Sequence, residues 1–321
     1  MANANVPSET GSPAARWVAR VVVLGAFATT LWLCGPRAAN VLAAKLRPDP
    51  ARSPAVALDS VGFVARPEWM DGPLLLAVSA SLSPWLQGEL RILDEDGARL
   101  MVAGLRSVAW VADVGVERMF PDRFRLRVEL RRPVLAVRDA DGAPLCLVDR
   151  AATMLPWVDT PLPVTFLHRE GGAGTMVNTA GQVAGDPRVR AAAAIAVEWR
   201  DDVAPQVAGC PRLVEVDATN LGERWLRGPS YPEIRVKLAR ADGAGVVFAY
   251  DRPVDSPLPR VPTSTKVTVL GCILQRHPGL AGLVAGDLRL LRRWADYLQP
   301  RANGVRDPIG PWADLESPRG G

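Results

Sequence analysis

Two runs of alternating apolar and polar residues flank a Pro121-Asp122 pair, and this pattern constrains the fold more than any other feature of the sequence. A period of two places alternate side chains on opposite faces of a strand, and Pro-Asp is typical of a turn. The sequence therefore predicts a β-hairpin with one buried face and one charged face. The buried face should carry Trp110, Ala112, Val114, Val116, Phe124, Leu126, Val128 and Leu130.

The residues before this hairpin complete a small α+β unit. Residues 56–64 predict a strand, and residues 67–86 and 93–108 have apolar side chains at helical spacing. In the second helix, Leu100, Met101, Leu105 and Val108 should share one face. The order strand, helix, helix, strand, strand then fills residues 56–137. A chain of 321 residues, 48% of them hydrophobic, has room for a second folded unit.

Residues 17–36 are the one segment of membrane length. Twenty helical residues span about 30 Å, which matches the hydrocarbon core of a bilayer. Trp17 and Trp32 would lie near the two interfaces, and Arg20 would extend its charge into the headgroups. We therefore expect an uncleaved signal anchor at 17–36, with residues 1–16 as a cytoplasmic tail and 37–55 as a Pro-rich linker.

Two other interpretations of this segment stay open, namely a cleaved signal peptide and a buried helix of a soluble protein. The charges also leave the orientation open. Arg16 and Arg20 precede most of the span, but Arg37, Lys45, Arg47 and Arg52 follow it. The positive-inside rule therefore leans slightly against export of the C-terminal part, although long domains are translocated despite such charges.

The hairpin and the strand after it also carry a family resemblance. The features are Trp110-Val111, the turn Phe120-Pro121-Asp122, a strand that ends in Arg131-Arg132-Pro133-Val134-Leu135-Ala136, and the segment Leu145-Cys146-Leu147-Val148-Asp149. Together they resemble the polypeptide-transport-associated (POTRA) domain and following strand of the FtsQ/DivIB family of bacterial cell-division proteins. That family usually has a Gly in the next turn, where this chain has Ala151-Ala152.

Farther along, the order of elements resembles the β-rich domain of the same family, and we expect that domain at 138–300, followed by a flexible tail at 301–321. The expected fold class is therefore α+β, with a transmembrane helix, a POTRA-like βααββ domain and a mixed β-rich domain with helices. The expected elements are a strand at 162–164, a helix at 188–203, a strand at 212–217, a hairpin at 233–250 that turns at Asp242-Gly243, a Lys266-led helix to 274, and the terminal motif Gly286-Asp287-Leu288-Arg289.

The resemblance implies a single-pass inner-membrane protein of the division septum whose bulk is periplasmic. Such a scaffold would recruit FtsB- and FtsL-like partners by adding a partner strand to a sheet edge. We expect that edge at 284–299, where aromatic residues are candidate hot spots. The candidate partner-binding residues are Leu288, Leu290, Trp294 and Tyr297, with Arg125 and Arg127 on the hairpin as a second surface.

No motif in the sequence indicates an active site. The two histidines, His168 and His277, lack a nucleophile context, and no phosphate-binding glycine loop is present. We expect no enzyme activity, cofactor or metal, and a formal net charge of +4 does not predict a nucleic-acid partner. The alternative is a secreted or periplasmic enzyme, or a carbohydrate-binding or transport-associated POTRA protein unrelated to division. Its candidate stacking platforms would be Trp85, Trp110, Trp157, Trp199 and Trp225.

The four cysteines also leave alternatives open. Cys34 lies in the expected membrane span, and no two cysteines are close in sequence. Cys146, Cys210 and Cys272 could stay as free thiols, or two of them could pair in an oxidising compartment.

The topology gives the first testable prediction. A reporter that is active only in the periplasm, fused after Pro300, should be active because residue 40 onward is expected outside the cytoplasm. A cytoplasmic reporter at the same position should be silent. The reverse pair of signals would contradict the single-span topology.

Overall fold

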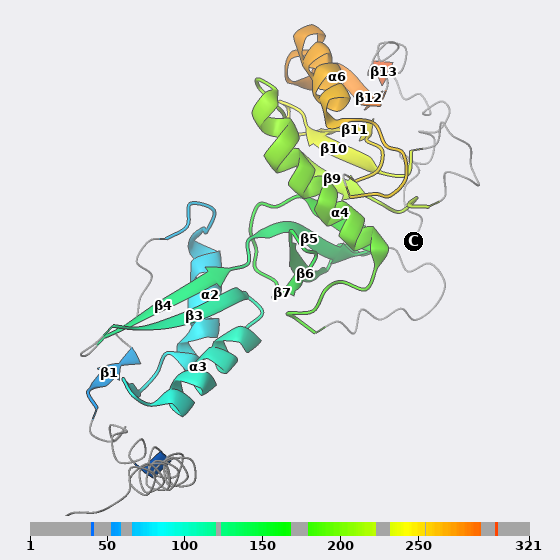
Figure 1. The fold of residues 1–321 in the computed structure, drawn as a ribbon. Helices are drawn as coiled ribbons and strands as arrows, with labels where there is room; N and C mark the ends of the chain where they lie inside the picture. The colour runs from blue at the N-terminus through cyan, green and yellow to red at the C-terminus, as the bar shows by residue number, and fades with distance from the viewer. Residues whose placement is uncertain are drawn as a thin grey trace, which may run out of the picture.

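The fold is described from a computed structural model, which defines residues 40–41, 53–58, 66–119, 123–167, 179–222, 232–253, 255–289 and 299–300. Figure 1 shows two units joined in a line, a smaller one built from α2, α3 and a hairpin, and a larger one built around a long sheet. Within the described residues, no helix has the length and apolar character needed to cross a bilayer. The expected anchor at 17–36 lies outside these residues, as does the tail at 301–321.

The first unit contains two helices that pack against a two-stranded hairpin. A short strand, β2, lies between the helices and pairs antiparallel with β1, a pairing that the sequence did not predict. The strand expected at 56–64 is described only in part, because residues 59–65 lie outside the described chain. The elements are β1 (Ala55–Ala57), α2 (Gly72–Leu82), η3 (Ser83–Trp85), β2 (Glu89–Arg91), α3 (Glu95–Ser107), β3 (Val111–Met119) and β4 (Arg123–Leu130).

Both helices begin at an aspartate that accepts a hydrogen bond from a backbone N–H of the first turn. Asp71 accepts from Leu74 at 2.9 Å, and Asp94 accepts from Gly97 at 2.9 Å. On α3, Ala98, Met101 and Leu105 form the buried stripe. Leu100 was expected on this face, but it is 72% exposed because it lies about 100° around the helix from Met101.

The predicted hairpin is present, with a shift of register near its start. Val111 pairs with Leu130 and Asp113 with Glu129, so Ala112 is an extra residue in a β-bulge. The bulge turns Val111 into the core and leaves Ala112 exposed, which reverses the prediction for these two residues. Beyond the bulge the predicted alternation is confirmed, because Val114, Val116, Leu126 and Val128 all pack in the core of the first unit.

The second unit is built on a nine-stranded sheet in the order β13-β12-β11-β10-β9-β8-β5-β6-β7. Its strands are β5 (Pro133–Asp139), β6 (Pro144–Asp149), β7 (Met154–Leu155), β8 (Val164–Leu167), β9 (Leu213–Asp217), β10 (Arg235–Ala239), β11 (Gly245–Ala249), β12 (Leu283–Asp287) and β13 (Gln299–Pro300). Pairing is parallel for β5–β8, β8–β9 and β11–β12, and antiparallel elsewhere. The hairpin at 233–250 is confirmed, whereas the strand predicted at 162–164 begins only at Val164 and continues to Leu167. The domain boundary expected between residues 137 and 138 falls inside β5.

Two helices cover the same face of this sheet (Figure 1). The first is α4 (Pro187–Glu198), which continues through a π-helical turn, η4 (Trp199–Val203), and a 3₁₀ turn, η5 (Ala204–Gln206). The second is α6 (Thr263–Arg276), followed by η6 (Pro278–Leu280). Both helices correspond to predicted ones, so the structure is a mixed α+β fold with a large sheet, as the sequence predicted.

The strands β5, β6 and β7 belong to both hydrophobic cores. Ala136 pairs with Leu147, which pairs with Leu155, and this row packs in the core of the first unit. The neighbouring row contains Leu135, Val148 and Met154, and it packs in the core of the second unit. The two units therefore share one end of the large sheet as a common wall.

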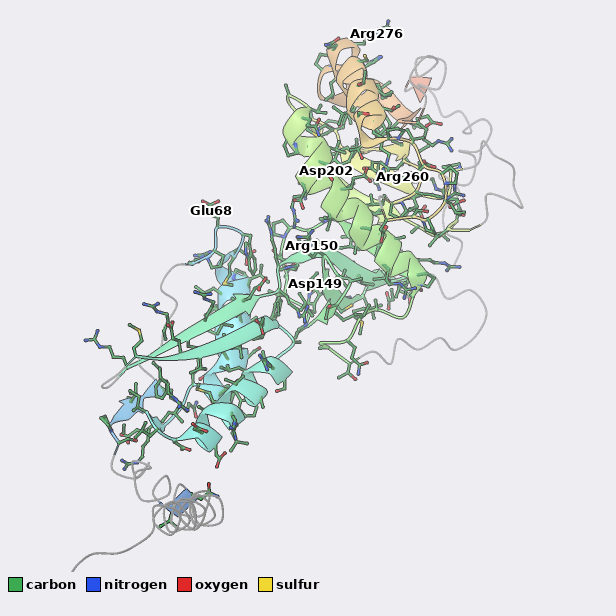
Figure 2. The ribbon with its side chains drawn as sticks, viewed as in Figure 1. Glu68, Asp149, Arg150, Asp202, Arg260 and Arg276 are labelled. Atoms are coloured by element: carbon green, nitrogen blue, oxygen red, sulfur yellow. The ribbon has the colours of Figure 1, made fainter. Side chains whose placement is uncertain are left out.

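Two polar contacts strengthen this junction. Asp71, the cap of α2, uses its second carboxylate oxygen to accept a hydrogen bond from the Thr160 hydroxyl at 2.9 Å. Arg131, which follows β4, contacts the buried Asp149 at 2.9 Å, and Asp149 also accepts from the backbone of Thr153 at 2.7 Å. Figure 2 places Asp149 and Arg150 where the two units meet.

The register of the hairpin gives a prediction of stability. Val114 is 2% exposed, so Val114→Asp would bury an unpaired carboxylate and should lower the free energy of unfolding by several kcal/mol. Arg127→Ser on the exposed face should cost less than about 1 kcal/mol. Denaturant titration of both variants checks this, and equal losses would show that the register is wrong.

Candidate functional site

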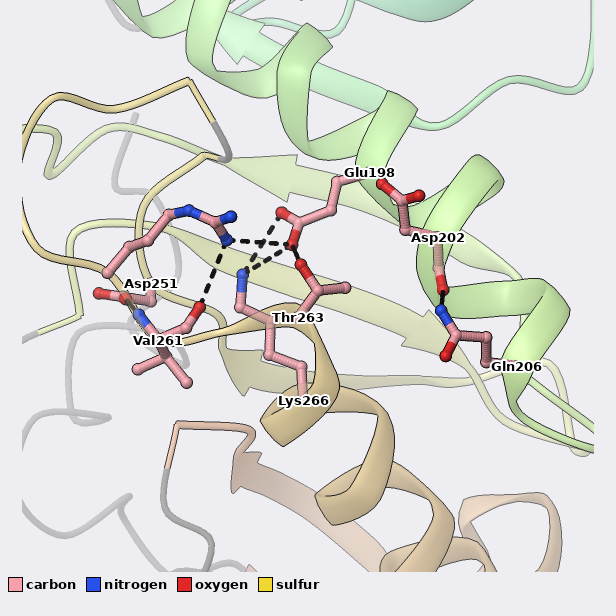
Figure 3. Close-up of polar contacts among 8 residues, drawn as sticks. Glu198, Asp202, Gln206, Asp251, Val261, Thr263 and Lys266 are labelled. Carbon is pink, nitrogen blue, oxygen red and sulfur yellow. Dashed lines mark hydrogen bonds and ion pairs between the residues drawn. The ribbon is translucent and has the colours of Figure 1, made fainter.

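A buried ion pair holds the two helices of the second unit together. Glu198 is at the end of α4, Lys266 is in the first turn of α6, and both side chains are 0% exposed. The Lys266 ammonium lies 3.2 and 3.3 Å from the two Glu198 oxygens, and Thr263 donates a hydrogen bond to the same carboxylate at 2.6 Å. Arg260 approaches it at 3.8 Å (Figure 3). The negative charge of the buried Glu198 carboxylate is therefore balanced by cations and a hydrogen-bond donor inside the protein.

An aromatic ring completes the environment of the lysine. The Lys266 nitrogen lies 3.8 Å from the centre of the buried Tyr250 ring, a distance suited to a cation–π contact. Burial lowers the pKa of Lys266, and the Glu198 carboxylate opposes that shift. Burial and the same carboxylate raise the pKa of Tyr250 well above its usual range. The pair is thus a structural contact that is closed to solvent.

The position of α6 determines where β12 begins. The chain passes from α6 through η6 directly into β12, which pairs parallel with β11. Arg240, at the end of β10, donates a hydrogen bond to the Leu283 carbonyl at 2.9 Å. Asp242 binds the same guanidinium through two hydrogen bonds of 2.6 and 2.7 Å and raises its pKa. The first residue of β12 is therefore fixed by a buried, oriented arginine.

A local contact closes the end of β12. Asp287 is 1% exposed and accepts hydrogen bonds from the Arg289 side chain at 2.7 and 2.9 Å and from the Arg289 backbone at 2.9 Å. The Leu288 backbone N–H donates to the Ala249 carbonyl at 3.0 Å. Most of β12 is buried, including the backbone of Gly286, so the outer edge of the described sheet lies at β13.

The outer neighbour of β12 is very short. Among the residues that the structure describes, β13 is the last strand of the sheet, and it pairs with β12 at Leu283↔Pro300 and Ala285↔Gln299. Gly286 and Asp287 extend past this pairing. We call β12 with β13 the edge pair. Within the part of the chain that the structure describes, no strand pairs with the outer side of β13, and an edge strand of this kind is where another chain can add to a sheet.

The sequence-predicted site residues have different locations. Leu288 is fully buried in the core of the second unit, so we assign it to packing and correct the expectation that it contacts a partner. Leu290, Trp294 and Tyr297 lie outside the described residues. Arg125 and Arg127 are exposed on β4, where Arg125 contacts Glu117 at 3.5 Å with both side chains more than half exposed. Such a pair contributes little to stability and leaves the hairpin face open to solvent.

Of the five tryptophans considered as stacking platforms, the four that the structure describes pack against other residues. Trp110 and Trp199 are buried in the cores. Trp85 is 41% exposed, but its ring covers Gly104, where an added Cβ would lie 2.1 Å from the ring. Trp157 is covered on one face by Arg138, at 4.9 Å from the ring centre. Trp225 lies outside the described residues.

The cysteines and acidic groups do not form a reactive cluster in the described part of the chain. Cys146, Cys210 and Cys272 are free thiols, so none of these three forms the disulfide that the sequence left open. Burial raises the pKa of Cys146 and of Cys210 to about 11, which keeps both protonated at neutral pH. Within the described residues, no group of three or more His, Cys, Asp or Glu side chains could hold a metal ion.

Comparison with protein-family models gives no match to this chain, and comparison with curated proteins gives no significant match.

The buried pair gives a prediction that separates charge from packing. Glu198→Gln would leave the Lys266 ammonium buried without its counter-ion and should cost about 3–5 kcal/mol of folding free energy. Adding Lys266→Met removes that charge with little change in volume, so the double variant should recover part of the loss. Chemical denaturation of the three variants measures this cycle. A double variant less stable than Glu198→Gln alone would contradict the assignment.

Proposed function

We propose that this protein is a non-enzymatic, membrane-anchored scaffold of the bacterial division site, similar to FtsQ, that recruits partners to the edge pair. The observation that carries the proposal is the edge pair itself. Its β12 strand is held at its start by Arg240, ends in a contact between the buried Asp287 and Arg289, and is flanked on its outer side by a two-residue strand. A partner strand would add outside β13, and because β12 is rigidly held, the entropic cost of ordering this edge is lowered.

The first unit supports the same proposal. Its order of elements, with two helices between an initial strand and a hairpin, agrees with the POTRA-like arrangement that the sequence resemblance implies. The added strand β2 is a departure from the simple βααββ order. The partners would be membrane proteins similar to FtsB and FtsL, and the chain would act at the septum in the inner membrane with its bulk outside the cytoplasm.

One turn adds support at the level of a residue. Ala152 has a φ of 57°, in the left-handed region that favours glycine, and it stands in the turn where the resembling family usually has Gly. Asp149 holds this turn by accepting hydrogen bonds from the Ala151 and Thr153 backbones at 2.9 and 2.7 Å. The local backbone is therefore the one that a glycine would favour, and side-chain hydrogen bonds maintain it here.

The partner site is tested by a pair of aromatic substitutions in the chain segment that joins β12 to β13. Trp294→Ala with Tyr297→Ala should abolish co-purification of the co-expressed FtsB- and FtsL-like partners, because aromatic anchors usually dominate such interfaces. Arg125→Ala with Arg127→Ala is the matched control on the hairpin and should leave co-purification unchanged. Circular dichroism should show both variants to be folded.

Two outcomes would contradict this placement. Normal partner recovery by the aromatic pair variant would locate the interface elsewhere. Loss of recovery in the hairpin variant alone would place it on the charged face of β4.

A further inference from the structure

A cleft lies between the first unit and the sheet, away from the edge pair. Its volume is about 360 Å³, and we call it the inter-unit cleft. The first unit contributes Trp69 and Leu74, from the start of α2, while Pro133, Pro163 and Leu213 come from the ends of the adjacent strands β5, β8 and β9. The last turns of α4 and the residues after it form the remaining wall. Sequence reasoning missed this cleft because its walls come from segments far apart in the chain.

The charge of the cleft is strongly one-sided. Arg132, Arg200 and Arg212 line it, and none of the lining residues is acidic. Arg200 is already bound by Asp201 through hydrogen bonds of 2.6 and 2.8 Å. Arg132 and Arg212 are exposed, and neither guanidinium makes a hydrogen bond or ion pair with the residues that the structure describes. Burial and the neighbouring Arg200 lower the pKa of Arg132, with Asp201 opposing the shift.

Apolar side-chain rings lie beside these arginines in the inter-unit cleft. Trp199 and Trp69 contribute indole rings, and Pro133, Pro163 and Pro211 contribute rigid apolar rings. Proline has no backbone N–H, so these strand ends are poorly suited to pairing with another strand. Recognition in the inter-unit cleft must therefore use side chains, unlike recognition at the edge pair.

We propose that the inter-unit cleft binds an acidic peptide segment of a partner protein. Two carboxylates of the segment would bind Arg132 and Arg212, since the planar guanidinium suits a carboxylate through paired hydrogen bonds. An apolar or aromatic side chain between them would fill the space against Trp69, Trp199 and Pro133. The cleft is at the small end of the range of roughly 300–1,000 Å³ usual for ligand sites, so it holds a few side chains of a segment.

This site is separate from the edge pair, because β10 and β11 lie between β9 and β12 in the sheet. The proposal does not depend on a role in division. It gives the chain a second binding surface at the junction of the two units. This surface would bind the carboxylates and the apolar side chain of a partner, not its backbone.

The test is selection of short random displayed peptides on the immobilised full-length chain, with counter-selection on an Arg132→Gln, Arg212→Gln double variant. We expect the selected peptides to share two acidic positions around an aromatic or aliphatic residue. A synthetic peptide of the consensus sequence should bind the double variant about tenfold or more weakly than the unmodified chain. Its affinity should also fall as salt rises, because the interacting charges are partly exposed.

The control is Arg99→Gln, which removes one exposed arginine from α3 and should leave the affinity unchanged. The Arg132 and Arg212 side chains are exposed, so the double variant should keep the melting temperature of the unmodified chain. Selection that yields no acidic consensus, or a consensus peptide that binds the double variant equally well, would overturn the proposal. So would arginine-dependent binding of inorganic phosphate or of vesicles containing anionic lipid when no peptide is selected.

Discussion

The alternation of side chains along β5, β6 and β7 is the constraint on which the arrangement of the two units depends. Successive residues of these strands point into different cores, with Ala136 and Leu147 in the first and Leu135 and Val148 in the second. A slip of one residue in the β5–β6 register would exchange the two sets and disrupt both cores at once. The orientation of the first unit on the sheet is therefore determined by strand pairing in the second.

A second chain of contacts leads from a buried charge to β12, the strand next to the outer edge of the described sheet. Glu198 and Lys266 connect α4 with α6, and α6 leads into β12. A buried pair of this kind gives little net stability compared with apolar packing, but its loss is costly. Its contribution in this fold is to fix one helix orientation, and hence the start of β12. Arg240 and Asp287 then fix the two ends of that strand.

Local patterns predicted much of this fold. The hairpin, the helices α3 and α4, and the pair β10–β11 follow from periodicity and turn residues, and the helix α6 was expected from the family resemblance. The sequence did not predict the bulge at Ala112, because two apolar residues in a row suit either face until the partner strand is known. The strand β2 was missed because three residues are too short to show a period. The Glu198–Lys266 pair joins residues 68 apart, and in the inter-unit cleft Arg132 is likewise distant in sequence from Arg200 and Arg212. Only the folded topology brings such groups together.

The central claim is that this chain acts as a scaffold where the envelope divides. Imaging a functional fluorescent fusion of the full-length chain in dividing cells tests it most directly. The account predicts a band at mid-cell that appears with constriction and persists in a strain carrying Arg99→Gln, a substitution far from the edge pair. A uniform peripheral signal throughout the cell cycle, or a signal released into the medium, would contradict it.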